Sequence, residues 1–291
     1  MWEEIKNLSF KFFGRALEPY VKNFDSITPD LQKANINLSL TEYIYVMAFA
    51  ILAVFLIEFP IVVIITTMLF KSAIIAFLFS ITSTIFIILG VFFMFYTYPS
   101  SVAKSRKRNI DGTLPFATTY MATVASSGAP PITMFRVLGK FKEYGEISKE
   151  AETIYRDVSA FGMDIMSSIK KTASRTPSAQ FKELLWGMET VLTTGSDLSD
   201  YLHGKSRLFM QEQKRRLQQF SNTLSILIEI YLTIILVGSI FFVIMTALMS
   251  IFGGGDTNLF LSFAQFIVIL VVLPVVSLGF IFLIKRISPT V

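Results

Sequence analysis

The chain has no cysteine and a single histidine, His203. Without cysteine it can form neither a disulfide scaffold nor a Cys-ligated zinc or iron–sulfur site, and thiol catalysis is excluded. One histidine is too few for a multi-histidine metal centre. Charge is also scarce, because 16% of the 291 residues are charged whereas 53% are hydrophobic, and 29 residues are Phe. This composition is typical of a membrane protein.

Two long blocks of the sequence are almost free of charge. The first covers 43–98 and contains only Glu58 and Lys71, and the second covers 225–284 and contains only Glu229 and Asp256. Each block exceeds one bilayer crossing of about 20 residues. Divided at Lys71 and at the Gly-Gly-Gly-Asp turn that ends at Asp256, the two blocks predict four transmembrane helices, near 43–70, 72–98, 225–251 and 260–284.

The distribution of basic residues predicts the orientation. All but one of the 26 Lys and Arg residues lie in the N-terminal arm, the central region or the C-terminal tail, and the exception is Lys71. The positive-inside rule therefore places both termini and the central region in the cytoplasm of a multi-pass cell-membrane protein. A three-span interpretation of the first block would put the arm and the central region on opposite sides. The membrane-proximal basic residues are Lys104, Arg106, Lys107, Arg108, Lys214, Arg215 and Arg216. They either anchor the chain near anionic lipid headgroups or bind a partner, and the sequence does not separate these roles.

The fold class predicted is an all-α polytopic membrane protein. About four transmembrane helices enclose a six-helix antiparallel cytoplasmic bundle, which lies between the second and the third. Residues 1–24 place apolar side chains at three- to four-residue intervals, as a helix at the membrane interface or one packed on the cytoplasmic domain would. The predicted domains are a cytoplasmic arm (1–42), transmembrane helices one and two (43–98), the bundle (99–224), transmembrane helices three and four (225–284) and a tail (285–291).

A repeat within the central region indicates helical hairpins. The motif Gly162-Met163-Asp164-Ile165 recurs 33 residues later from Gly195, and a looser copy begins at Gly128. Glycine closes one helix in the left-handed conformation, and an aspartate two residues later caps the next helix. In the looser copy Pro131 suits the first turn of a helix. The predicted corner residues are Gly128, Pro131, Gly162, Asp164, Gly195 and Asp197.

The residues between these corners predict six helices with no strand. Ser148 and Ser178 are expected to be N-caps. Antiparallel helices that enter from the membrane and return to it must alternate in direction, so all three glycine corners are expected at the membrane-distal tip. No glycine or proline lies between Gly204 and Gly238, so the last of these helices can continue into the third span. The six predicted helices cover 114–127, 131–143, 148–160, 164–176, 178–194 and 197–224.

No catalytic, metal or cofactor site is predicted. The sequence from His203 to Ser206 ends like a phosphate-binding loop, but the required upstream glycine is Ser199 and no strand precedes it. The spans contain no aspartate, which disfavours an aspartyl intramembrane protease. The strongly polar residues within the spans are Glu58, Glu229 and Gln265, fewer than a transporter usually needs. A small transporter or channel is nevertheless retained as the alternative function.

Several motifs in the central region resemble the F-domain of platform proteins from type II secretion and type IV pilus systems, in particular the archaeal branch. They are Leu114-Pro115-Phe116, the run from Ser127 to Pro131, Ile147 to Ala151, Arg175-Thr176-Pro177-Ser178, Thr194 to Leu198 with Tyr201-Leu202, and Glu229-Ile230-Tyr231. The resemblance covers about 110–250, and the order of two spans, one domain and two spans is similar to half-length, tight-adherence-type members. Ser196 departs from the second glycine that archaeal relatives often have.

The resemblance implies a non-enzymatic membrane platform for a type IV pilus-like or type II secretion-like machine. It implies a separate hexameric secretion ATPase and pilin-like subunits as partners, with no nucleic acid. Full-length platforms contain two such domains, so a second copy or a paired sister protein is expected. We expect the tip residues Ser126, Ser127, Pro130 and Asp200 to contact the ATPase. The resemblance leaves open whether the filament is a pilus, an archaellum-like motor or a secretion pseudopilus.

Overall fold

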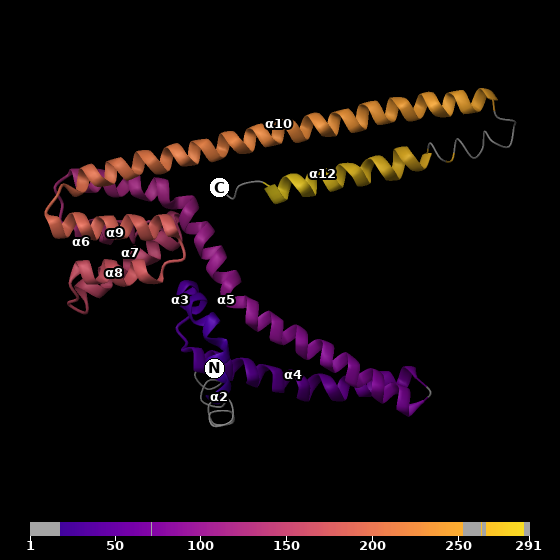
Figure 1. Cartoon of the computed structure of the whole chain (residues 1–291), viewed down its shortest axis with the longest axis horizontal. Coiled ribbons are helices and arrows are strands. Elements are labelled where there is room, and N and C mark those ends of the chain that lie inside the picture. Colours follow the sequence, from indigo (N-terminus) through magenta and orange to yellow (C-terminus); the bar gives the residue numbers. More distant parts are fainter. Residues whose placement is uncertain (1–17, 71, 253–262, 264–265, 288–291) are drawn as a thin grey trace. The chain divides into compact units, whose positions relative to one another are not determined.

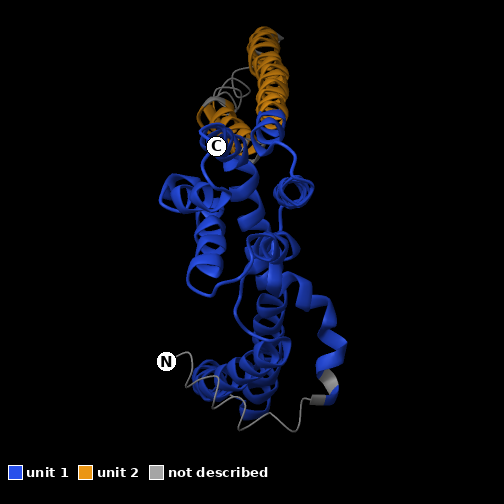
Figure 2. Cartoon of the chain, turned by 90° about the vertical axis from the view of Figure 1, so that its left-hand side faces the viewer, with its two compact units in different colours: residues 1–206 blue, residues 207–291 orange. Residues whose placement is uncertain are grey.

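The computed structural model describes residues 18–70, 72–252, 263 and 266–287, and over these residues the chain is helical with no strand (Figure 1). The chain divides into two compact units, 1–206 and 207–291, which are coloured separately in Figure 2. Most of the predicted amphipathic segment 1–24 lies outside the described residues.

A short arm precedes the first long helix. It consists of α2 (Glu18–Val21), the 3-10 helix η1 (Lys22–Ile27) and α3 (Thr28–Ala34). Asn35 ends α3 in the left-handed conformation, with φ of 56°. The turn directs the apolar side chains of the arm towards the start of the next helix, where Ile27, Leu31 and Tyr43 form a small buried cluster. The arm is therefore packed on the long helices.

Helices α4 (Leu40–Leu69) and α5 (Ala73–Ser126) form an apolar hairpin. The first begins with a capping box, in which Ser39 Oγ accepts from the Glu42 amide and the Glu42 carboxylate accepts from the Ser39 amide. Figure 1 shows the two helices running side by side from their connection. Near that connection the hydroxyls of Thr66 and Ser80 lie 2.7 Å apart. The predicted break at Lys71 matches the gap between the helices, although Lys71 itself lies outside the described residues.

Helix α5 continues well past the end of the predicted second span. It includes Pro99 and Pro115, so the predicted start of a separate helix at 114 is wrong. A proline inside a helix leaves the carbonyl four residues earlier without its usual amide donor. For Pro99 that carbonyl belongs to Phe95, and the Tyr43 hydroxyl donates to it at 2.7 Å. A side chain of α4 therefore replaces the missing hydrogen bond, which accounts for the tolerance of proline here.

Four further helices and the beginning of a fifth complete the first unit. They are α6 (Pro131–Leu138), α7 (Glu146–Ser159), α8 (Ile165–Arg175), α9 (Ala179–Thr194) and the start of α10 (Leu198–Phe252). The prediction of helix to residue 143 is wrong, because α6 ends before Gly139 and is followed by the 3-10 helix η2 (Lys142–Tyr144). Any side chain at Gly139 would crowd the backbone of Glu152, since its Cβ would lie 3.1 Å from the Glu152 Cα.

The two predicted N-caps have different outcomes. Ser178 caps α9 as predicted, because its Oγ accepts from the Phe181 amide at 3.1 Å. The prediction for Ser148 is wrong, since α7 begins two residues earlier and Ser148 lies inside it. The Ser148 hydroxyl donates to the Gly139 carbonyl at 2.9 Å instead, and thereby ties α7 to the end of α6.

The helical domain has an apolar core to which each of its helices contributes. On α5 the buried residues Ile110, Leu114 and Met121 recur at the spacing of one helix face. Burial of aliphatic and aromatic side chains is the main stabilising contribution, about 1.5–3 kcal/mol for each large side chain. The other large, fully buried side chains of the domain are Met134, Phe135, Leu138, Ile147, Ile154, Ile169, Leu184, Leu185 and Met188.

The second unit contains the rest of α10, a π-helical segment η3 (Val268–Val272) and α12 (Leu273–Ile287). Within it, the Tyr231 hydroxyl lies 3.0 Å from Ser277 Oγ, and the Tyr231 ring stacks on Phe280 at 4.5 Å. The predicted turn at 253–256 lies outside the described residues. Among the described residues, three helices, α4, α5 and α10, are long and apolar enough to cross a membrane, and α12 is a shorter apolar helix. These are the helices of a membrane protein, and the number of four spans remains a prediction.

Candidate functional site

The glycine corners have the geometry that a helix-to-helix turn requires. Gly128, Gly162 and Gly195 have φ of 72°, 67° and 71°. This region is unfavourable for residues with a Cβ, so glycine suits these positions. After two of the corners an aspartate caps the next helix: Asp164 accepts from the Ser167 amide at 3.1 Å, and Asp197 accepts from the Ser199 amide at 2.7 Å.

Direct contacts bring the three corners together. Ser126, at the end of α5, has its Oγ 2.8 Å from both Ser199 Oγ and His203 Nε2 of α10. This contact joins the Gly128 and Gly195 corners. Thr193 near the end of α9 donates to the sulfur of Met166 at 3.3 Å, which joins the Gly162 and Gly195 corners. The three corners therefore form one surface, which we call the tip.

The residues expected to contact the ATPase lie on this surface. Ser126, Ser127, Pro130 and Asp200 are all exposed. Pro130 occupies the N-cap position of α6, and Pro131 follows in its first turn. Asp200 lies in the first turn of α10, where its amide also donates to the Asp197 carboxylate at 3.2 Å. The tip therefore presents hydroxyls, a carboxylate and rigid proline turns to solvent.

A buried charge network lies elsewhere in the first unit, and the sequence analysis did not identify it. Glu150 of α7 is 2% exposed and accepts from two arginines, Arg106 Nη2 at 2.7 Å and Arg175 Nη2 at 2.6 Å. Arg106 also donates through Nε to Glu146 at 2.6 Å and through Nη1 to the Lys33 carbonyl at 2.6 Å. The network thus connects α3, α5, α7 and α8. A buried carboxylate between two guanidinium groups is stable only because its oxygens are fully paired.

Arg106 differs in this respect from the other membrane-proximal basic residues. It is 8% exposed and holds the helices together, so its charge does not face lipid headgroups or a partner. The remaining six residues, Lys104, Lys107, Arg108, Lys214, Arg215 and Arg216, are exposed, which leaves both predicted roles open for them. The sequence feature that distinguishes Arg106 from these six residues is its spacing, since it precedes the buried Ile110 by four residues and therefore lies on the same face of α5.

The same network changes the acidity of Glu146. Burial raises the pKa of this carboxyl, but hydrogen bonds from Lys149 and Arg106 lower it more strongly, and the net effect is a pKa below the ordinary value of 4.5. Glu146 is therefore ionised at neutral pH. Its amide also donates to Asn109 Oδ1 at 2.7 Å, which fixes the start of α7 on α5.

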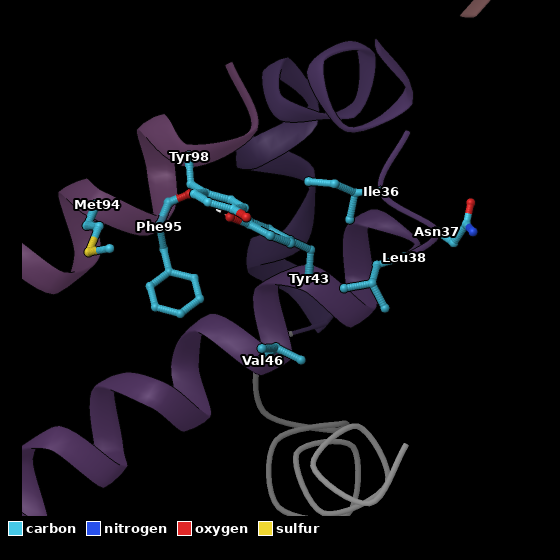
Figure 3. Close-up of a pocket in the computed structure, with 8 residues that line it drawn as sticks. All are labelled: Ile36, Asn37, Leu38, Tyr43, Val46, Met94, Phe95 and Tyr98. Atoms are coloured by element: carbon cyan, nitrogen blue, oxygen red, sulfur yellow. Dashed lines mark hydrogen bonds between the residues drawn. The ribbon is translucent and has the colours of Figure 1, made fainter. Parts of the chain in front are cut away.

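An apolar pocket of about 490 Å³ lies at the base of the α4–α5 hairpin. Figure 3 shows the side chains of Tyr43 and Tyr98 approaching one another across it. The pocket sits beside the Tyr43 to Phe95 hydrogen bond, at the level where the apolar part of α5 ends. Its lining residues are Ile36, Asn37, Leu38, Tyr43, Val46, Met94, Phe95 and Tyr98.

Among the residues that the structure describes, no group of three or more His, Asp or Glu side chains is placed to hold a metal ion. His203 Nε2 is engaged with Ser126, and the sequence from His203 to Ser206, which ends like a phosphate-binding loop, lies inside α10 rather than in a loop.

Residues 117–246, which include most of the helical domain and the apolar part of α10, match the family model for the type II secretion system (T2SS), protein F. Over these 130 of its 291 residues the chain is similar to that family. No solved structure matches it.

Three curated archaeal proteins are similar to this chain. The uncharacterized protein MJ1286 of Methanocaldococcus jannaschii is 30% identical over 150 residues, which is 51% of this chain and 25% of the relative. Flagella accessory protein J of the same organism is 23% identical over 137 residues, 47% of this chain and 24% of the relative. Flagella accessory protein J of Methanococcus voltae is 27% identical over 116 residues, 40% of this chain and 21% of the relative. The matched segment thus spans a quarter or less of each relative.

Proposed function

We propose that this chain is a membrane platform of a type IV pilus-like or type II secretion-like machine. It couples a hexameric cytoplasmic ATPase to the insertion or extraction of pilin-like subunits. The observation that carries the proposal is the segment 117–246 that matches T2SS protein F, joined at both ends to helices long and apolar enough to cross a membrane. The similarity to two flagella accessory proteins supports the same class of machine.

The role proposed for the helical domain is mechanical. A force-transmitting domain must keep its shape when one surface is pulled, and two features of this domain support that role. The core is filled by large apolar side chains, and the network around Glu150 ties α5, α7 and α8 together with three arginine–carboxylate hydrogen bonds. Both termini and the domain lie in the cytoplasm in this proposal, and a second copy or a sister chain supplies the second domain.

We place the ATPase contact at the tip. Its residues are exposed, and a soluble hexamer can reach it without contacting lipid. The structural role of Asp164 and Asp197 as caps uses their carboxylates, so these two are less suited to a partner than Asp200.

The test is a binding measurement with the purified secretion ATPase of the same organism and the full chain in nanodiscs. Ser127→Arg and Asp200→Lys should weaken binding at least tenfold. Ser174→Arg is the matched control, since Ser174 is an exposed serine at the end of α8 away from the Gly162 corner. The hydroxyls of Ser174 and Ser127 each donate to the carbonyl three residues earlier. Wild-type affinity of the tip variants, with loss of binding in Lys107→Glu or Arg215→Glu, would move the contact to the membrane-proximal face.

A further inference from the structure

Glu229 is a carboxylate placed on the exposed surface of an apolar helix. It lies about one turn inside the predicted third span, and its side chain is exposed. Glu58, the other acidic residue that the structure describes within the predicted spans, is different, because both of its carboxylate oxygens are buried within the first unit. An ionisable group in contact with hydrocarbon is costly, and such groups usually face a partner or a functional path. Glutamate is also too short to reach far from its position, unlike the long lysine and arginine side chains.

The structure shows a groove around Glu229. A cavity of about 490 Å³ runs along α10, and we call it the α10 acidic groove; it is lined by Ser225, Ile228, Glu229, Leu232, Thr233, Leu236 and Val237. The polar members recur every fourth residue, so Ser225, Glu229 and Thr233 form one stripe on the helix. The Ser225 and Thr233 hydroxyls donate to carbonyls of α10 itself, at 3.0 Å and 2.8 Å. Within the second unit, the Glu229 carboxylate is thus the member of the stripe that is available for a donor from another helix.

The groove faces away from the helix that packs on α10. Tyr231, which contacts Ser277 and Phe280 of α12, is two residues from Glu229, and two residues correspond to about 200° around a helix. Within the second unit the apolar flanks of the groove are also open, with Leu232 46% and Leu236 55% exposed. Residues 225–237 extend over about 18 Å at 1.5 Å per residue, which matches three turns of a second helix.

We propose that the α10 acidic groove binds the transmembrane helix of another polypeptide that carries a positive charge near its cytoplasmic end. Charge complementarity selects this occupant: the apolar flanks pack on a helix, and Glu229 pairs with its cation in a region of low dielectric. A second copy of this chain is disfavoured, because a two-fold contact through this face would set two Glu229 carboxylates against each other. Lipid acyl chains fill the apolar flanks but offer the carboxylate no donor. The inference rests on the proposed function, since a platform for pilin-like subunits must hold single membrane helices.

The experiment uses the full chain in nanodiscs and a synthetic probe. The probe is a single-span helix of leucine and alanine, about 20 residues long, with one lysine at its cytoplasmic end, and its partner probe carries glutamine there instead. Fluorescence transfer between labelled protein and probe gives the affinity. The lysine probe should bind at least tenfold more tightly than the glutamine probe, which is about 1.4 kcal/mol. Glu229→Gln should remove this preference, whereas Glu58→Gln, the matched control, should retain it.

Disulfide cross-linking locates the contact, and single cysteines can be introduced directly because the chain has no native cysteine. Leu232→Cys should cross-link to a cysteine in the lysine probe, and Ile235→Cys, one turn from Tyr231 on the opposite face, should not. Equal affinity of the two probes, an unchanged preference in Glu229→Gln, or a Leu232→Cys homodimer in place of the probe adduct would each overturn the proposal. No ATPase takes part in this measurement, so its failure is distinct from a failure of the tip to bind the ATPase.

Discussion

Replacement of Glu150 by glutamine tests whether the buried charge network holds the helical domain together. The substitution keeps the size of the side chain and removes its charge. Arg106 retains Glu146 and the Lys33 carbonyl as acceptors, whereas the ion pair between Arg175 and Glu150, with its 2.6 Å hydrogen bond, is lost. The Arg175 Nε is already buried without an acceptor, so the guanidinium is left with an uncompensated charge.

The expected cost follows from the burial of this pair. Removing one partner of a buried ion pair typically costs about 3–5 kcal/mol, because the other charge stays desolvated. The Arg175 side chain is 22% exposed and recovers some hydration, so we expect about 3 kcal/mol. At 1.4 kcal/mol per tenfold change, this corresponds to roughly a hundredfold increase in the open population of the domain.

Hydrogen exchange followed by mass spectrometry on the full chain in nanodiscs measures this change directly. Amides of α7 and α8 should lose protection by roughly a hundredfold in Glu150→Gln. The matched control is Glu183→Gln, since Glu183 forms an ion pair with Lys205 but is 66% exposed. An exposed pair contributes about 0–1 kcal/mol, so protection should change less than about fivefold there. Equal protection in the two variants would refute the assignment of a structural role to the network.

Three further predictions concern other contacts. Gly187→Ala should destabilise the domain by about 1–3 kcal/mol, because a Cβ there would collide with the Tyr201 hydroxyl. Gly204→Ala, on an open part of α10, should stabilise it by up to about 1 kcal/mol, and thermal unfolding that ranks the two variants in the opposite order would contradict this packing. The ionised Glu146 stabilises the fold above the ordinary carboxyl pKa of 4.5, and this stabilisation is lost as pH falls through the lowered pKa of the folded state. Glu146→Gln should therefore reduce the loss of unfolding free energy on acidification, and an unchanged loss would contradict the role of Glu146. For the orientation, an impermeant thiol reagent on intact cells should label Ser72→Cys and leave the exposed Ser174→Cys unlabelled, and the reverse pattern would invalidate the assigned topology.

The sequence alone determined the class of the protein and much of its helical pattern. Long uncharged apolar blocks can be stable only in a membrane or in a large core, so composition was sufficient to indicate membrane helices. Glycine followed by aspartate is a local signal, because the glycine adopts the left-handed conformation that ends one helix and the aspartate side chain caps the next. The starts of the helices after the Gly128, Gly162 and Gly195 corners were therefore predicted within a residue or two of those in the structure.

Tertiary structure decided the features that depend on residues distant in sequence. The sequence predicted that the second span ends at 98 and that a separate helix begins at 114, but Tyr43 supplies the hydrogen bond that Pro99 removes, and α5 continues to Ser126. Serine is a favoured N-cap residue, yet Ser148 lies inside α7, where its hydroxyl donates to the Gly139 carbonyl.

Arg106 shows the same limit most clearly. It belongs to a basic run for which the sequence left both membrane anchoring and partner binding open, and only its spacing of four residues from Ile110 indicates that it turns inward. Its role is set by Glu146 and Glu150, which are 40 and 44 residues away in the sequence. A buried charge is stable only where its partners are fixed, and that is determined by how the helices pack.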